Sequence, residues 1–217
     1  MVIRSFTSRA LGLAILAAGG ASACAPGIHP LPGVAPANPD LPLFQLPPIP
    51  ERMDFRWELN DGPTVARGDG VARLGPPDHA RVDLFLGGGF GGAAAILVGD
   101  SLIVPPGSRG LDLVPPAPLL WAALGRLALP AVRDTIIRVS GDTLRASLGS
   151  PVQWRITSVA GKLTRVERIA GARIVEWVER QPGNRIRYEL SGQRSLVLDI
   201  QKQQPVAAFD ESIWHFQ

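Results

Sequence analysis

Glycine-bearing turns recur at short, regular intervals through the second half of the chain, and this spacing constrains the fold more than any other feature. Short β-rich runs lie between the turns, which is typical of strands that pair with their chain neighbours in an antiparallel meander. The turns are Ser140-Gly141-Asp142, Gly149-Ser150-Pro151, Ala160-Gly161-Lys162, Ala170-Gly171, Pro182-Gly183-Asn184 and Ser191-Gly192. We therefore predict consecutive hairpins from residue 139 almost to the end of the chain.

The runs between these turns alternate apolar and charged residues. Ile186, Tyr188 and Leu190 alternate with two arginines and a glutamate, and the run 196–200 repeats the apolar spacing. Successive side chains of a strand point to opposite faces, so each run has one apolar and one charged face. An apolar sheet face must be buried against another layer. The sequence thus predicts an α+β protein, mainly β, with one face of its antiparallel sheet buried.

Strand patterns also fill the first half of the domain, which we expect to span residues 51–217. Phe55 and Trp57 alternate with charged neighbours, and Val82 and Leu84 follow the same period. The stretch 93–98 is continuously apolar, as in a strand that is covered on both faces.

One convincing helix interrupts the strands, at residues 118–125. Prolines precede it, a position that favours a helix start, and Gly125 is a plausible stop. The segment is apolar almost all round, so we expect the helix to be buried or inserted into a cavity.

The N-terminus has the order of a secretory signal peptide, at residues 1–23. Arg4 and Arg9 form a basic start, an apolar run follows, and small residues precede Cys24, the chain's single cysteine. The run is shorter than the ~20 residues that cross a bilayer as a helix. The order resembles a bacterial lipoprotein signal, which implies that Cys24 is lipidated and becomes the first mature residue. An ordinary secretory signal with a chance cysteine is the alternative.

Residues 24–50 hold the cysteine and a proline-rich stretch. Nine prolines lie between residues 26 and 50, and such a composition favours extended polyproline conformations over a packed fold. We expect this segment to be a tether between the anchor and the domain. In the alternative, its apolar residues pack back on the domain: Leu41, Leu43, Phe44 and Leu46.

Charge and composition exclude several classes of function. The chain has 22 Lys+Arg and 19 Asp+Glu, and removing Arg4 and Arg9 with the signal leaves 20 against 19. A nearly neutral domain gives no reason to expect nucleic-acid binding. With one cysteine and three scattered histidines, we expect neither an internal disulfide nor a metal site, and no cofactor.

Three local features resemble one bacterial family. A glycine-rich turn between two strands lies at residues 84–93, and Gly99-Asp100 follows in a second turn. The apolar helix at 118–125 ends near a glycine, and Asp210 and Phe216 follow a last hydrophobic strand. In this layout the chain resembles the LolA/LolB group of lipoprotein-handling proteins, and its LolB-like branch most closely.

The resemblance implies an unclosed, or half, β-barrel: a curved antiparallel sheet with a helical lid over an apolar cavity. It implies a function without bond chemistry, in which an outer-membrane lipoprotein binds acyl chains of lipoproteins or lipids and helps deliver them. The implied partners are those chains, the membrane and a periplasmic carrier protein. The residues expected to line the cavity are Trp57, Leu86, Trp154 and Trp177, and those expected in the lid are Leu120, Trp121 and Leu124. Ordinary core packing is the alternative for each.

The glycine-rich turn places one large apolar group among five glycines, at residues 87–92. Glycine contributes no side chain to a core, so we expect Phe90, between Gly89 and Gly91, to insert into the membrane. Burying its ring would gain about 1.5–3 kcal/mol, enough to orient an already tethered domain. In the alternative, Phe90 folds back onto the sheet.

Two motifs suggest other chemistry. The turn 87–92 spells G-x-G-x-x-G, but no βαβ pattern surrounds it, as a dinucleotide site requires. Gly99-Asp100-Ser101-Leu102 matches the opening motif of GDSL-type esterases, although Asp210 and His215 lack that family's spacing. Esterase activity and a structural envelope protein with a filled core therefore remain as alternatives.

Overall fold

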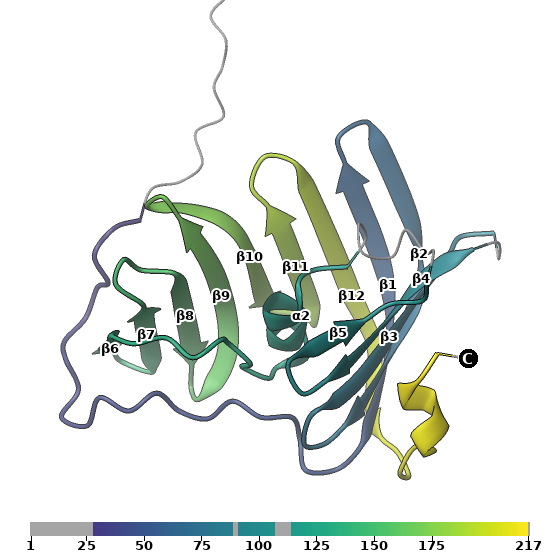
Figure 1. Cartoon of the computed structure of the whole chain (residues 1–217), viewed down its shortest axis with the longest axis horizontal. Coiled ribbons are helices and arrows are strands. Elements are labelled where there is room, and N and C mark those ends of the chain that lie inside the picture. Colours follow the sequence, from purple (N-terminus) through teal and green to yellow (C-terminus); the bar gives the residue numbers. More distant parts are fainter. Residues whose placement is uncertain (1–27, 89–90, 107–113, 217) are drawn as a thin grey trace, which may run out of the picture.

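The described part of the protein, in a computed structural model covering residues 28–88, 91–106 and 114–216, is dominated by one antiparallel sheet (Figure 1). Its order is β5-β4-β3-β2-β1-β12-β11-β10-β9-β8-β7-β6. The strands are β1 (Glu51–Asp61), β2 (Thr64–Gly75), β3 (His79–Leu86), β4 (Gly92–Val98), β5 (Ser101–Ile103), β6 (Thr135–Ser140), β7 (Thr143–Leu148), β8 (Trp154–Val159), β9 (Lys162–Ala170), β10 (Arg173–Gln181), β11 (Arg185–Leu190) and β12 (Arg194–Pro205).

The sheet is not closed. The first and last strands, β1 and β12, pair at its centre, while β5 and β6 form the two edges. These edge strands are consecutive in the chain, and the connection between them contains the helix α2 (Ala117–Leu124). The predictions of a hairpin meander and of an unclosed half-barrel are both confirmed.

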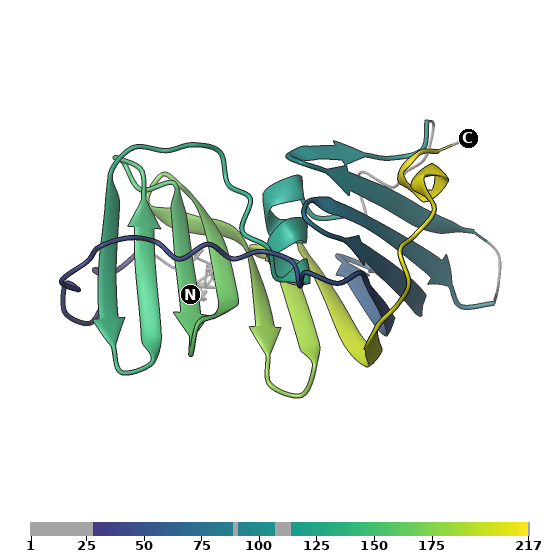
Figure 2. The same cartoon turned by 90° about the horizontal axis from the view of Figure 1, so that it is seen from below.

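The sheet curves around α2, so that its two wings stand on either side of the helix (Figure 2). Strand β1 carries an irregularity between Asp54 and Phe55, where its pairing with β12 shifts register. Opposite it, β2 has glycines at Gly68 and Gly70, and a Cβ at Gly70 would lie 2.3 Å from Cε2 of Phe55. The absent side chains leave room for large aromatic rings on the concave face.

Alternation along the strands places the core on this concave face. In β1 the buried residues are Met53, Phe55, Trp57 and Leu59. The intervening positions carry charged or polar side chains that reach the convex face. The helix α2 has six consecutive buried residues, from Leu119 to Leu124, which agrees with its predicted burial.

The proline-rich segment lies along the domain rather than away from it in its described part (Figure 1). Val34 forms a bridge with Val139 on the edge strand β6. Phe44 and Leu46 are buried, whereas Leu43 is 87% exposed. Leu127 N donates to Phe44 O at 2.9 Å. The packed alternative therefore describes Leu41, Phe44 and Leu46 but not Leu43, and the domain boundary at residue 50 stays a prediction.

The C-terminal tail covers part of the convex face. A short 3-10 helix, η1 (Glu211–Trp214), contacts β3 and β4. Trp214 is buried there, and a Cβ at Gly75 would lie 2.6 Å from its ring. The ring centroid of His79 lies 5.4 Å from that of Trp214. The tail thus forms a second, smaller apolar contact outside the main core.

Candidate functional site

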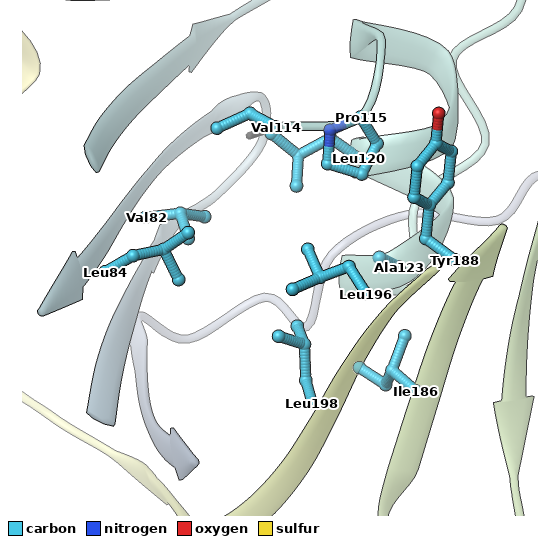
Figure 3. Close-up of a pocket in the computed structure, with 10 residues that line it drawn as sticks. All are labelled: Val82, Leu84, Val114, Pro115, Leu120, Ala123, Ile186, Tyr188, Leu196 and Leu198. Carbon is cyan, nitrogen blue, oxygen red and sulfur yellow. The ribbon is translucent and has the colours of Figure 1, made fainter. Parts of the chain in front are cut away.

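A small cavity lies between α2 and the concave face of the sheet (Figure 3). Its volume is about 20 Å³, which is room for a single water molecule. Residues from both wings and from the helix surround it: Val82, Leu84, Val114, Pro115, Leu120, Ala123, Ile186, Tyr188, Leu196 and Leu198. Apart from one tyrosine, this lining is entirely apolar.

The tyrosine hydroxyl is bound to a buried carboxylate. Tyr188 OH donates to Glu176 Oε2 at 2.9 Å, and Arg168 Nε also donates to Glu176. Burial, together with the nearby charge of Glu176, raises the pKa of Tyr188 above its usual value. The phenol therefore stays protonated and its hydroxyl is occupied, so the ring is what Tyr188 offers to the cavity.

The ends of α2 follow from local sequence. Pro116 and Pro118 frame the start of the helix, where a missing backbone N–H costs nothing. Gly125 ends it in the left-handed conformation, with φ of 97°, and its N–H bonds to Ala122 O. Arg126 N then bonds to Trp121 O. The result is a short apolar helix that begins at prolines and ends in a glycine C-cap.

Side chain to carbonyl hydrogen bonds hold α2 on both flanks. Toward the β4–β5 turn, Trp121 Nε1 and Arg126 Nη1 donate to Gly99 O at 2.8 Å and 3.1 Å. The Arg126 guanidinium also stacks over the Trp121 ring, 4.5 Å from its centroid. Toward β10, Arg180 Nη1 donates to Ala123 O. Between these polar attachments the helix contacts the sheet through apolar side chains.

Most of the residues expected in the lining or lid lie on the concave side. Trp57 and Trp154 are buried there, but they belong to the packed core beside the cavity. In α2, Leu120 lines the cavity, and Trp121 and Leu124 are buried in the core. Leu86 lies at the open end of β3 and is 36% exposed.

Trp177 is the exception, and its assignment to the cavity is wrong. Its neighbours Glu176 and Val178 are buried on the concave face, so strand alternation turns Trp177 to the convex face. There its ring lies under two guanidinium groups, with Arg165 Cζ 4.1 Å and Arg187 Cζ 5.7 Å from the centroid. Trp177 is therefore part of the convex charged surface.

Sequence reasoning did not assign several residues to the site. Ile186, Tyr188, Leu196 and Leu198 were recognised as one apolar face but not as cavity lining, although their alternation was the signal for it. Arg180 carried no such signal, because its contact with α2 joins segments distant in sequence.

The expected membrane contacts lie partly outside the described residues. Cys24, Gly89 and Phe90 fall there. Gly91 is described and has φ of 82°. Beside it, Phe85 is 50% exposed on the opposite face from Leu86. The described stem of the turn thus presents apolar side chains to the solvent.

The motifs for other chemistry occupy plain hairpins. Gly99 and Asp100 form the β4–β5 turn, and Ser101 is exposed with no hydrogen bond to a histidine among the described residues. Asp210 instead caps η1 by accepting from Ser212 N at 2.9 Å. The G-x-G-x-x-G turn joins the antiparallel strands β3 and β4, so no βαβ unit surrounds it.

The described residues contain neither a metal-binding cluster nor a membrane-spanning helix. They contain no group of three or more His, Cys, Asp or Glu that could hold a metal ion. Within the same ranges, no helix is both long and apolar enough to cross a membrane.

Comparison with known proteins finds similarity at the level of structure. No family profile matches the chain, and a search of curated proteins gives no match. A LolA superfamily protein from Nitrosomonas europaea is similar with a TM-score of 0.46 at 12% identity, covering 80% of this chain and 93% of that chain. A DUF1329 family protein from Desulfovibrio piger has a TM-score of 0.37 at 11% identity, covering 76% and 89%.

A third similar structure is a protein domain from Vibrio parahaemolyticus that is described as outer membrane lipoprotein-sorting. It has a TM-score of 0.30 at 7% identity, and 76% of this chain and 88% of that chain are covered. One of the three neighbours is described as a LolA superfamily protein.

Proposed function

We propose that this protein is a lipid-anchored envelope protein that binds acyl chains of lipoproteins or lipids between its curved sheet and α2. It helps deliver them to the outer membrane, receiving them from a periplasmic carrier, and makes or breaks no bond. One observation carries the proposal: an apolar concave face is covered by a helix that is buried all round and held by hydrogen bonds on its two flanks.

The cavity volume sets the mechanism. Drug-sized ligand pockets have volumes of ~300–1,000 Å³, whereas this cavity holds about 20 Å³. A bound chain must therefore take the place of side chains that α2 contributes, among them Leu120 and Ala123. Because the acyl chain packs against the sheet as the helix did, the main cost is breaking the flanking hydrogen bonds. Each of these is worth about 0.5–1.5 kcal/mol, or 1.5–3 where a charge takes part.

The strand directions support one membrane-facing rim, by which we mean the end of the sheet that carries the β3–β4 turn. In this up-and-down sheet the β3–β4 and β9–β10 turns lie at the same end. Ile28 N bonds to Ala172 O in the β9–β10 turn, and the few residues from Cys24 to Ile28 span at most about 14 Å. A lipidated Cys24 and the Phe90 turn would then meet the same bilayer.

Binding of an acyl chain tests the proposal directly. The chain from residue 25 onward keeps every described residue and removes the anchor. Titration with a fluorescent fatty acid should give saturable binding at one site, and an unlabelled acyl lipid should displace the probe. Saturable binding that is unchanged by Leu198→Trp, which fills the cavity from β12, would place the probe elsewhere and contradict the proposal.

The small volume of the cavity under α2 favours a second function, that of a structural or interaction protein. If α2 stays in place, the core is filled, and the protein presents its convex Arg/Glu surface to an envelope partner. This alternative predicts no uptake of fatty acid at any concentration below the probe's own aggregation. It also predicts that substitutions on the convex face, such as Trp177→Ala, have larger effects in the cell than substitutions in the cavity.

A further inference from the structure

A groove opens beside the C-terminal end of α2, between the N-terminal segment and the β8–β9 turn. Its volume is about 290 Å³. Phe44, Leu124 and Leu163 give it an apolar wall, and Lys162 and Arg180 give it two cations. No carboxylate is among its lining residues in the described part of the chain.

Arg180 has donors to spare at this groove. One of its N–H groups, on Nη1, donates to Ala123 O, and no other hydrogen bond or ion pair of Arg180 occurs among the described residues. Burial lowers the pKa of its guanidinium, and the charge of Glu51, which forms no ion pair with it, partly opposes this shift. Arginine nevertheless remains charged at neutral pH, so a half-buried cation faces the groove without an anion against it.

Three arginines on the neighbouring strands β9 and β11 differ in this respect. Arg165 forms an ion pair with Glu167 at 2.7 Å, and Arg187 forms one with Glu189 at 2.7 Å. Arg168 pairs with the buried Glu176. Among the described residues Arg180 has no such partner, so its guanidinium fork could bind an oxyanion in the groove through two parallel hydrogen bonds.

We propose that this groove binds the oxyanion head, a carboxylate or a phosphate, of an amphiphile whose chain passes along Phe44 and Leu124 toward the cavity. The inference rests on the proposed function and adds the chemistry of the cargo's head. Arg180 binds the oxyanion, and Lys162 adds a second, exposed positive charge. Because a guanidinium that binds the oxyanion with its remaining N–H groups turns toward the groove, binding of the head strains the hydrogen bond to Ala123 O and loosens the attachment of α2 on this flank.

The test compares ligands that differ in the head alone. A fluorescent fatty acid and its methyl ester are titrated into the chain from residue 25 onward. The acid should bind about ten- to a hundredfold more tightly than the ester, the range of a hydrogen bond to a charged group. Arg180→Met should abolish this preference, and Lys162→Gln should reduce it severalfold. Arg173→Gln, at the other end of β10, removes an exposed cation as a matched control and should leave the preference unchanged.

Further ligands separate the two sources of the oxyanion. Lysophosphatidate that competes better than oleate would assign the head to a phospholipid, and the reverse would assign it to a free fatty acid. Inorganic phosphate alone should weaken binding of the acid but not of the ester.

The outcomes separate this inference from the function on which it rests. Equal affinities for acid and ester in the wild-type chain would overturn the head site and leave acyl-chain binding intact. A preference that survives in both Arg180→Met and Lys162→Gln would also overturn it. Binding of neither ligand would overturn the acyl-chain function, and the head site with it.

Discussion

The two flanks of α2 are attached in opposite ways. On the β4–β5 flank the helix side supplies the donors, since Trp121 and Arg126 both reach Gly99 O. On the β10 flank the sheet supplies the donor, since Arg180 reaches Ala123 O. The first attachment includes a fully buried indole, and the second depends on one cation beside an open groove. If α2 moves when an acyl chain binds, as proposed above, we expect it to open from the β10 flank, with the Trp121 flank acting as the hinge.

The largest expected effect comes from removing the hinge. Trp121→Ala should destabilise the fold by about 3–5 kcal/mol, because it leaves a cavity where a fully buried ring was. Urea unfolding followed by circular dichroism measures the change. Trp177→Ala is the matched control on the convex face and should cost clearly less. Equal losses would remove the distinction between a buried hinge and a surface tryptophan.

Removing the hydrogen bond on the β10 flank should change the affinity for ligand more than the free energy of unfolding. Arg180→Met removes a hydrogen bond that involves a charge, worth about 1.5–3 kcal/mol. The neutral methyl ester should therefore bind about tenfold or more tightly, because α2 leaves the sheet more easily. Fluorescence titration with the ester measures the gain, and Arg173→Gln should show none. Weaker ester binding in Arg180→Met would show that Arg180 does not hold the helix closed.

Tyr188 reports whether water enters from the β10 flank, and it is the only tyrosine in the chain. Its raised pKa means that the native state resists ionisation near pH 10, the usual pKa of tyrosine. The stability that Tyr188 contributes is thus present below that pH and lost as the pH rises above it. Ultraviolet titration should show no tyrosinate near pH 10 until the protein unfolds. Ionisation of the folded protein at that pH would mean that the flank is already open.

The smallest expected effect concerns the rim. Phe90→Glu should weaken binding of the chain from residue 25 onward to phospholipid vesicles severalfold, because the loss of one partly inserted ring costs less than its full burial energy of about 1.5–3 kcal/mol. Vesicle co-sedimentation measures it. Val159→Glu, which alters an exposed apolar residue at the opposite rim, should have no effect, and an equal loss there would contradict the assignment of the rim.

The sequence predicted the sheet well because strand order follows from the turns. Glycine turns after residue 139 and alternating runs such as Ile186, Tyr188 and Leu190 predicted the hairpins that the structure contains. The helix was expected at 118–125 and lies at Ala117–Leu124. The prediction that the sheet does not close came from the family resemblance, since alternation alone does not say whether a sheet closes.

The site was harder to predict because it depends on contacts between distant segments. In β10 both alternate sets contain apolar and charged residues, so the pattern did not reveal that Glu176 faces inward and Trp177 outward. The proline content of residues 26–50 favoured a tether, so the burial of Phe44 and Leu46 was expected only in the alternative. The small cavity volume depends on how α2 side chains fill the sheet, which no local pattern encodes.

Movement of α2 on binding is the claim on which the account depends, and a distance measurement tests it most directly. The chain from residue 25 onward lacks the native cysteine, so spin labels can be placed at Ala117→Cys in α2 and Lys202→Cys in β12. Pulsed electron paramagnetic resonance should give a distance that changes by several ångströms when a fatty acid binds. A distance distribution that stays the same with the fatty acid bound would contradict the account.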